Sequence, residues 1–341
     1  MQTNKVTRTR FTLDWALDIS WCGLMVFNRK RIRLTLKLNG KDEVFTSDNQ
    51  NKLSVVGLRI SADVTFGYGS PAPYARIRVY GLPQETMNKL ITAKWQNVKA
   101  LRTLITIEAA EGDGDFAQVF SGGIFMALPE YSEAPNVSIV IEAMSAVFES
   151  KLATAAESYE GVHSVAEIIA GICQRIGFSF ESNGVNAVVD NAYLTGSDLD
   201  KIRWLCANTD LDLYLGNNSV AITPKGSARK IKVAVISPET GLIGYPIITN
   251  IGATFRCLYD PSIQFGALVR VKGSEIELCN GDWRVYGMRA QLETEMDSGR
   301  WFMEIVGSNL KDKNVHVAKW NGITLCSWRL SGRCQNTRVH Y

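Results

Sequence analysis

The chain has 341 residues, of which 46% are apolar and 21% are charged, so extensive disorder is excluded and two or three globular domains are expected. Its net charge of +3 is too small for a dedicated nucleic-acid binder, which carries a strong basic bias. The local basic cluster at Arg29, Lys30, Arg31 and Arg33 is interpreted as the solvated beginning of a strand.

Residues 1–29 contain the one stretch that resembles a membrane or export segment, FTLDWALDISWCGLMVF. Asp14 and Asp18 interrupt it, and it is shorter than the ~20 apolar residues of a spanning helix. It also lacks the uninterrupted apolar centre and the cleavage site of a signal peptide. We therefore expect no membrane insertion and predict an N-terminal segment that docks on its own chain or on a neighbour.

Residues 30–153 show the two-residue alternation of half-buried strands. In LRISADVTF, the apolar side chains from Leu58 to Phe66 all fall on one face. The other stretches with strand character are RIRLTLKL, ARIRVYGL, TLITIEA, AQVFSGGIF and NVSIVIEA. A short helix is expected in PQETMNKLI, with Pro83 in its first turn. This spacing of strands predicts a first β-barrel over residues 30–153.

Residues 154–228 change to a mixed pattern that predicts a small α/β domain. SVAEIIAGICQRIG has one apolar helical face, a capping box at Ser164 and Glu167, and Gly177 at its end. SDLDKIRWLCANTD repeats this plan with Ser197 as the cap. Each predicted helix leads into short strands, and Asn217-Asn218 fits the tip of a hairpin.

Residues 229–310 return to strand patterns and predict a second β-barrel. Asn280-Gly281, between two apolar alternations, is the clearest hairpin signal in the chain. In LYDPSIQFGALVRVKG, Asp260, Pro261 and Gly266 are interpreted as a barrel corner, because no general base or ligand set accompanies them. The pattern is lost from Lys311, so residues 311–341 are predicted to be a tail that orders on a partner.

A weak internal similarity relates the two predicted barrels. Residues 118–143 and 283–308 each contain a strand with an aromatic residue and a glycine, then a polar crossing, then a strand that ends in Ile and a small residue. The chain is therefore predicted to be mainly β with an α+β insert, in which two related β-barrels flank the small α/β domain.

The search for chemistry gives no catalytic, cofactor-binding or metal-binding residues. His163, His316 and His340 lack a second ligand at metal spacing, and His163 is interpreted as a residue at the start of a helix. GYGSPAP is not followed by the helix of a phosphate-binding loop. The acidic groups are interpreted as soluble turns: Glu111, Asp113 and Asp115 in one, and Glu293, Glu295 and Asp297 in the other.

The cysteines and tryptophans carry weaker information. Seven scattered cysteines without a Cys-x-x-Cys pair indicate synthesis in a reducing compartment and no disulfide framework. The sequence leaves open whether Cys326 and Cys334 pair. Trp15, Trp21, Trp320 and Trp328 lie outside the predicted cores, which favours contact surfaces for assembly into a larger body.

Two segments carry a resemblance to a known family. ARIRVYGLPQETMNKL resembles the strand and short helix of the first tube-like barrel in the central baseplate hub proteins of contractile phage tails. The run from ETGLIGYPIITN to NGDWRVYGM resembles their second barrel, in which a TGL-x-G-x-P loop precedes a strand. The matching positions are Thr240, Gly241, Leu242, Gly244, Pro246, Pro261, Gly266, Asn280 and Gly281, and the resemblance covers roughly residues 30–310.

The resemblance implies a structural function without catalysis, cofactor or metal. Such a hub is a homotrimeric ring in the virion that joins the sixfold tail tube to the threefold central spike. Its implied partners are itself, the tail tube protein, the spike protein, other baseplate proteins and the tape measure protein. DNA passes through its lumen during genome ejection, and assembly takes place in the cytoplasm of the bacterial host.

Two alternatives from other classes stay open at this point. A tail-associated enzyme that degrades the cell wall would use a carboxylate pair that includes Glu111 or Glu293. A monomeric glycan-binding module would use the tryptophans near the termini.

Overall fold

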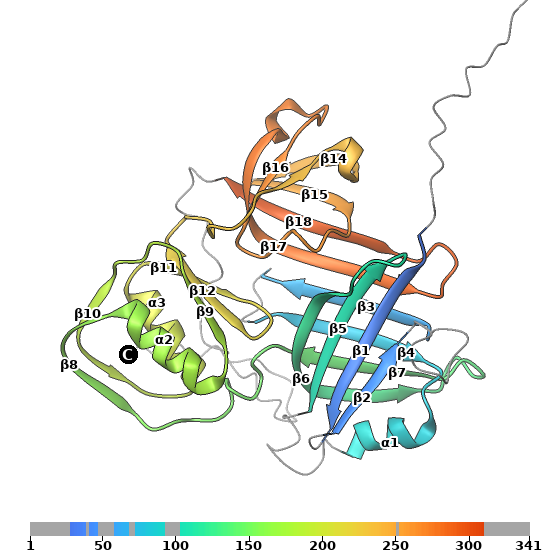
Figure 1. Cartoon of the computed structure of the whole chain (residues 1–341), viewed down its shortest axis with the longest axis horizontal. Coiled ribbons are helices and arrows are strands. Elements are labelled where there is room, and N and C mark those ends of the chain that lie inside the picture. Colours follow the sequence, from blue (N-terminus) through green and yellow to red (C-terminus); the bar gives the residue numbers. More distant parts are fainter. Residues whose placement is uncertain are drawn as a thin grey trace, which may run out of the picture.

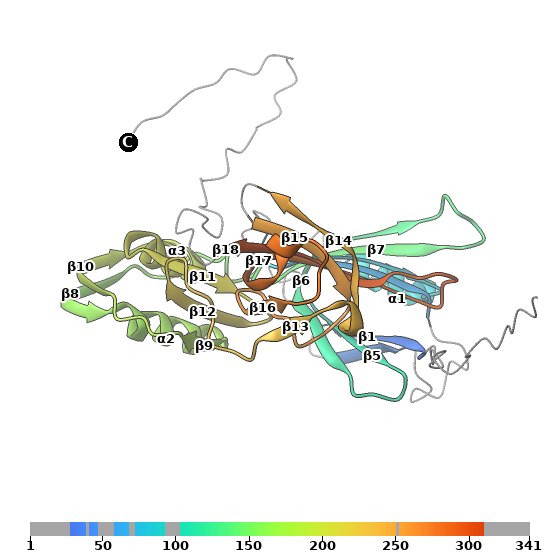
Figure 2. The same cartoon turned by 90° about the horizontal axis from the view of Figure 1, so that it is seen from above.

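The computed structural model describes residues 28–38, 41–46, 58–67, 72–92, 103–249 and 252–309. The protein is mainly β with an α+β insert, as the sequence predicted. Most strands join one 13-stranded sheet, and the insert lies beside it (Figure 1). The view from above shows the same side-by-side arrangement (Figure 2). Within the described ranges, no helix is long and apolar enough to cross a bilayer.

The strands of the large sheet form two sets that are separated in the sequence by the insert. The first set comprises β1 (Lys30–Leu38), β2 (Lys41–Thr46), β3 (Ile60–Phe66), β4 (Tyr74–Tyr80), β5 (Leu104–Glu111), β6 (Ala117–Glu130) and β7 (Ser138–Met144), with α1 (Gln84–Thr92) after β4. The second set comprises β13 (Ala234–Ile236), β14 (Leu242–Thr249), β15 (Gly252–Leu258), β16 (Leu268–Val271), β17 (Gly281–Thr294) and β18 (Trp301–Asn309), with the short 3-10 helices η3 (Pro238–Thr240) and η4 (Glu277–Cys279).

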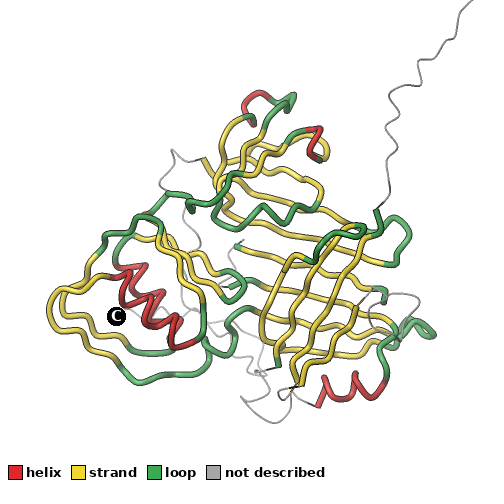
Figure 3. Tube along the Cα trace, viewed as in Figure 1, coloured by secondary structure: helices red, strands yellow, loops and turns green. Residues whose placement is uncertain are grey.

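The insert packs two helices against short strands (Figure 3). Its elements are β8 (Glu157–Ser164), α2 (Val165–Ile176), β9 (Ser179–Ser182), β10 (Val188–Leu194), α3 (Asp198–Asn208), β11 (Leu211–Leu215) and β12 (Ser219–Pro224). β8 pairs with β10, and β9, β11 and β12 form a second small sheet. The apolar faces of α2 and α3 share one core with these strands, separate from the core of the large sheet.

The predicted alternation is realised in the large sheet. Ile60, Ala62, Val64 and Phe66 of β3 are buried, and the residues between them are half-buried. The buried side chains of both strand sets form one continuous apolar cluster. Burial of this apolar cluster is the main stabilising contribution, at about 25 cal/mol per Å² of apolar surface.

The two strand sets repeat the same arrangement. Their spatial orders are β3-β4-β7-β6-β5-β1 and β14-β15-β18-β17-β16-β13, and the five counterpart strands from β3 and β14 onward also follow each other in the same chain order. One difference breaks the repeat: β1 pairs antiparallel with β5, whereas β13 pairs parallel with β16.

The internal sequence similarity between residues 118–143 and 283–308 falls on equivalent strand pairs of this repeat, β6-β7 and β17-β18. β6 and β17 each have 14 residues, and each is followed by a partner that returns antiparallel, β7 or β18. Each has a bulge against that partner, between Ile124 and Met126 in β6 and between Val285 and Gly287 in β17. The bulges bend β6 and β17. Along its length, β6 pairs first with β5 and then with β7, and β17 pairs first with β16 and then with β3.

The two sets are joined by direct pairing of β17 with β3. The register runs from Met288 opposite Phe66 to Thr294 opposite Ile60. The sheet therefore continues from one set into the other. The domain limits predicted from the sequence stay predictions.

Three local predictions were wrong. Asn280-Gly281 is not a tight hairpin, because Asn280 follows η4 and its side chain closes a longer loop on the backbone N–H and C=O of Ser274, each at 2.9 Å. The TGL-x-G-x-P segment is not a loop, because Leu242 begins β14. Ser164 ends β8 and precedes α2 in an extended conformation, but its side chain makes no capping hydrogen bond, so the predicted capping box with Glu167 does not form.

Other local predictions were confirmed. Gly177 ends α2 in the left-handed conformation, and Ser197 caps α3 in a capping box with Asp200. Asn217 and Asn218 form the tip between β11 and β12. The short helix expected in PQETMNKLI is α1, although Pro83 directly precedes it and does not lie in its first turn.

In the corner at residues 259–267, Asp260 and Pro261 form the predicted turn. Asp260 Oδ1 accepts from the Ser262 N–H at 2.8 Å, which is the local turn expected of Asp before Pro261. Gly266 has φ of 79°, and a Cβ built on it would lie 2.5 Å from the ring of Tyr214 in the insert. Gly266 is therefore needed both for its backbone conformation and for close contact with the insert.

We predict that Gly266→Ala lowers the free energy of unfolding by about 2–4 kcal/mol, because backbone strain and overpacking add. Gly161→Ala is the matched control, since Gly161 has φ of 78° but nothing within 4 Å of a built Cβ. Urea unfolding measured by tryptophan fluorescence compares the two variants. Equal losses would show that the contact with Tyr214 contributes nothing.

Candidate assembly surfaces

The hairpin tip of the insert is hydrogen-bonded to the irregular part of β6. Against β5, β6 has a register shift at Val119. Asn217 Oδ1 accepts from the Ser121 N–H at 3.1 Å, and Asn217 Nδ2 donates to Val119 O at 3.0 Å. One side-chain amide thus satisfies two backbone groups of β6, which fixes the insert on the first strand set.

A buried ion pair fixes the insert on the second strand set. Arg284 of β17 and Asp212 of β11 are 2.8 Å apart, with side-chain exposures of 0% and 4%. Arg284 also donates to Ser308 Oγ at 3.0 Å, and Asp212 accepts from the Gly226 N–H at 2.8 Å. A buried pair with such additional hydrogen bonds is strongly destabilised when one partner is removed.

A cavity of about 280 Å³ lies where the three parts meet. Its lining combines Phe66 of the first strand set, Asn217 of the insert and Pro261 of the corner. Arg229 also borders it and is held by Glu181, at 2.5 Å, and by Phe265 O, at 3.0 Å. None of the candidate catalytic carboxylates lines this cavity.

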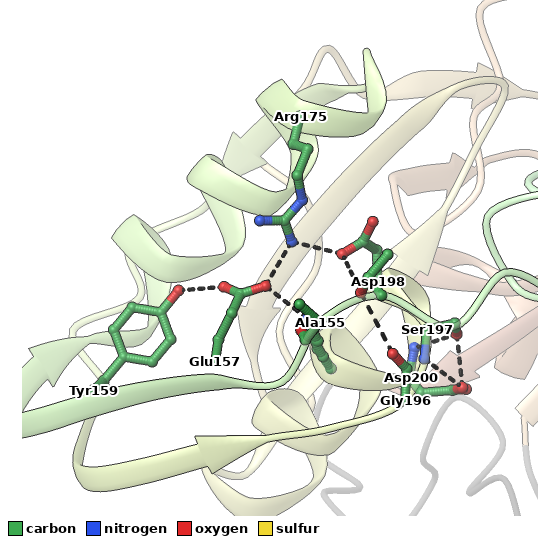
Figure 4. Close-up of polar contacts among 10 residues, drawn as sticks. Ala155, Glu157, Tyr159, Arg175, Gly196, Ser197, Asp198 and Asp200 are labelled. Atoms are coloured by element: carbon green, nitrogen blue, oxygen red, sulfur yellow. Dashed lines mark hydrogen bonds and ion pairs between the residues drawn. The ribbon is translucent and has the colours of Figure 1, made fainter.

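A polar network holds the chain where it enters the insert (Figure 4). Arg175 of α2 contacts Glu157 at 2.8 Å and Asp198 at 2.5 Å, and Tyr159 donates to Glu157 at 2.7 Å. The ammonium of Lys201, with 0% side-chain exposure, lies 2.6 Å from both Glu157 and Ala155 O. Burial by itself raises the pKa of Glu157, but these hydrogen bonds and the charge of Arg175 outweigh it and lower the pKa.

Both acidic clusters of the sequence, at residues 111–115 and 293–297, contain carboxylates that pair with cations. Glu111 lies 2.5 Å from Lys30, and Glu295 lies 2.7 Å from Arg29, so the structure brings these two carboxylates to the same end of β1. Glu293 accepts from the Arg300 side chain and from its N–H at 2.9 Å. Burial would raise the pKa of Glu293, but the hydrogen bonds from Arg300 lower it, whereas a general acid needs a raised pKa.

The remaining candidate residues have structural contacts. Arg31 and Arg33 lie over the ring of Phe116, at 4.9 and 3.9 Å from its centroid. His163 lies in β8, edge-on to Tyr159 at 5.5 Å. Among the described residues, no group of three His, Cys, Asp or Glu side chains could hold a metal.

The cysteines of the described ranges, Cys173, Cys206, Cys257 and Cys279, are buried free thiols. Burial raises the pKa of Cys206 and of Cys257 to about 12, so these thiols are neutral and pack as apolar side chains.

Apolar side chains are exposed at both ends of the strand path that runs from β14 to β6. At one end, Tyr245, Ile247 and Ile248 of β14 are 68%, 65% and 46% exposed. At the other end, Leu128 of β6 is 53% exposed, and the following Tyr131 is 50% exposed. This exposed apolar pattern was not predicted, although GYPIIT shows an apolar run interrupted by Gly244 and Pro246.

Several sequence predictions lie outside the described residues. They concern the docking segment before residue 28, the tail after residue 309, the four tryptophans near the termini, His316 and His340, and the pair Cys326 and Cys334.

The fold is that of phage tail proteins. A prophage MuSo2 43 kDa tail protein from Shewanella oneidensis superimposes with a TM-score of 0.55 and 11% identity, covering 84% of this chain and 99% of that one. A tail protein from Neisseria meningitidis MC58 gives a TM-score of 0.53 at 10% identity, covering 82% and 96%. An E. coli component of the type VI secretion system, described as similar to the T4 tail proteins gp27 and gp5, gives 0.50 at 7% identity, covering 79% and 78%.

The chain belongs to the baseplate hub gp41 family, whose pattern matches residues 32–303. No curated protein sequence matches it. Family membership makes it a structural component of the phage tail baseplate, which confirms the predicted resemblance.

We predict that Arg284→Met lowers the free energy of unfolding by about 3–5 kcal/mol, because it leaves the Asp212 carboxylate buried without its cation. The double variant Arg284→Met with Asp212→Leu should recover part of this loss. Lys225→Met is the control, since Lys225 pairs with Asp210 at the surface and its loss costs at most about 1 kcal/mol. If urea unfolding gives equal losses for Arg284→Met and Lys225→Met, the buried pair does not fix the insert.

We predict that the insert loses stability in acid through Glu157. Its folded pKa is lowered below the ordinary 4.5, so the stabilisation is fully present above 4.5 and is lost as pH falls through the lowered value. Hydrogen exchange of α2 and α3 against pH measures this loss. Glu157→Gln should flatten the dependence, whereas the exposed-site variant Glu160→Gln should leave it unchanged.

Proposed function

We propose that this protein is the central hub of a contractile-tail baseplate, in which three copies form a ring around a lumen. The observation that carries the proposal is the repeated strand order of the two sets, joined into one sheet by β17 and β3. The family and the tail-protein fold support a place in the baseplate.

The repeat gives the ring its symmetry. Three copies of a chain with two similar units present six similar units around one axis, in closed cyclic symmetry. Such a ring matches a sixfold tail tube on one side and a threefold central spike on the other. The proposed units are residues 30–153 and 229–310, with residues 154–228 as the small domain between them.

The proposed partners follow from this position. They are two further copies of the chain, the tail tube protein, the central spike protein, other baseplate proteins and the tape measure protein. DNA contacts the ring only in transit during genome ejection, and the ring is assembled in the host cytoplasm before it becomes part of the virion.

The proposed role is structural and not enzymatic. A cell-wall-degrading activity would need a protonated carboxylic acid near neutral pH. Glu293 is instead held ionised by Arg300, and Glu111 lies 2.5 Å from the Lys30 ammonium. These contacts favour the hub over the enzyme.

We expect the purified full-length protein to be a trimer at micromolar concentration, and negative-stain electron microscopy to show rings with a central hole. Sedimentation equilibrium gives the mass independently of shape. A monomer at all concentrations up to about 100 µM, with no ring in the micrographs, would overturn the proposal.

A further inference from the structure

The internal junction between β17 and β3 has an unpaired counterpart at the outer edges of β6 and β14. By the repeat, β6 corresponds to β17 and β14 corresponds to β3. β17 uses its outer edge, from Met288 onward, to pair with β3. In the part of the chain that the structure describes, no strand pairs with the matching edge of β6 beyond Gly123, or with the outer edge of β14.

We propose that residues 128–131 of one copy lie against residues 246–249 of β14 in a second copy, edge to edge and antiparallel. This rests on the proposed hub function and names the surface through which the copies meet. The junction is head-to-tail, so each copy uses both its β6 edge and its β14 edge, and the successive contacts close into a ring.

The repeat predicts the register of this junction. The bulges align Met126 with Gly287, so Leu128 of β6 corresponds to Arg289 of β17. The hairpin β14-β15 corresponds to the hairpin β3-β4. Thr249 pairs with Gly252 in the first as Thr65 pairs with Tyr74 in the second, so Thr249 corresponds to Thr65. Arg289 lies opposite Thr65 in the internal junction. Leu128 of one copy is therefore expected opposite Thr249 of the next.

The side chains at the two edges fit a protein surface that becomes buried. Leu128 and Tyr131 at one edge and Tyr245, Ile247 and Ile248 at the other are among the exposed large apolar residues. An open edge with apolar side chains is a template for another strand. Pro129 and Pro246 lack N–H groups, so the backbone hydrogen-bond ladder between the two strands is short. Apolar side-chain contacts therefore supply much of the stability of the junction.

The internal junction also shows what packs beside it. Phe265, from the corner at residues 259–267, reaches Phe66 of β3 with ring centroids 6.4 Å apart. The same place in the first strand set is taken by α1, whose Gln84 donates to Tyr131 Oη at 3.1 Å. Helix α1 is thus positioned to flank the junction with the second copy, as the corner flanks the internal one.

Cysteine cross-linking of the full chain tests the register. In a background with Cys22, Cys326 and Cys334 changed to serine, Leu128→Cys with Thr249→Cys should oxidise to covalent dimers and a closed trimer on non-reducing gels. The matched control combines Leu128→Cys with Val162→Cys, which is 67% exposed on β8 and should give no cross-link. Native mass spectrometry of the unmodified protein is run alongside.

The outcomes separate the junction from the hub. A trimer whose cross-link is absent, or equals that of the control, overturns the junction and leaves the hub intact. A monomer in native mass spectrometry overturns both. A covalent ladder that closes at another number of copies supports the junction and overturns the trimer.

A charge placed in the junction gives a second test that does not depend on cysteine chemistry. Ile248→Arg should weaken self-association at least tenfold, because it puts an unpaired charge into an apolar contact. Tyr193→Arg, at a site 65% exposed on the insert, should leave association unchanged. Circular dichroism confirms folding of both variants, and equal association of the two would overturn the junction.

Discussion

The pairing of β17 with β3 is the contact on which the architecture depends. It joins strands from opposite ends of the described chain, and Arg289 and Asp63 form an ion pair across it although they are 226 positions apart. Because this ladder is made of ordinary antiparallel pairs, two separate strand sets become one sheet with one continuous apolar interior. Without it, each set would expose a further open edge.

The insert is held in place by contacts that differ in kind. Asn217 supplies hydrogen bonds to a bulge in β6, whereas Arg284 and Asp212 form a buried ion pair with β17. Tyr214 packs against Gly266 at the corner. Since these contacts reach both strand sets, the insert reinforces the same junction that β17 and β3 make directly.

Much of the fold could be predicted from the sequence, because period-two alternation directly records one buried face per strand. The same reasoning missed β8, because its half-buried face carries residues such as Glu157, Gly161 and His163 and shows no apolar period. It also missed β10, where only Ala192 and Leu194 are buried. It failed at Asn280 because a side chain closes the loop there, and turn propensity alone does not reveal its partner Ser274.

The assembly surfaces were harder to predict than the fold. Arg284 looks like an ordinary outward residue of an alternating strand, and only the insert, more than 70 positions earlier, makes it a buried one. The first part of the exposed edge of β14 falls in the segment that the family resemblance gave as a loop, and Gly244 and Pro246 leave no clear alternation there. Such positions depend on distant partners, which one sequence does not encode locally.

The opposite directions of β1 and β13 have a consequence for any circular arrangement of this chain. β1 carries an additional neighbour, β2, whereas the short β13 is the last strand on its side among the described residues. The two strand sets therefore end differently on the side of β1 and β13, and in a three-copy ring these two kinds of end alternate around the circumference. The rim that they form has only threefold symmetry, whereas the shared sheet stays close to sixfold.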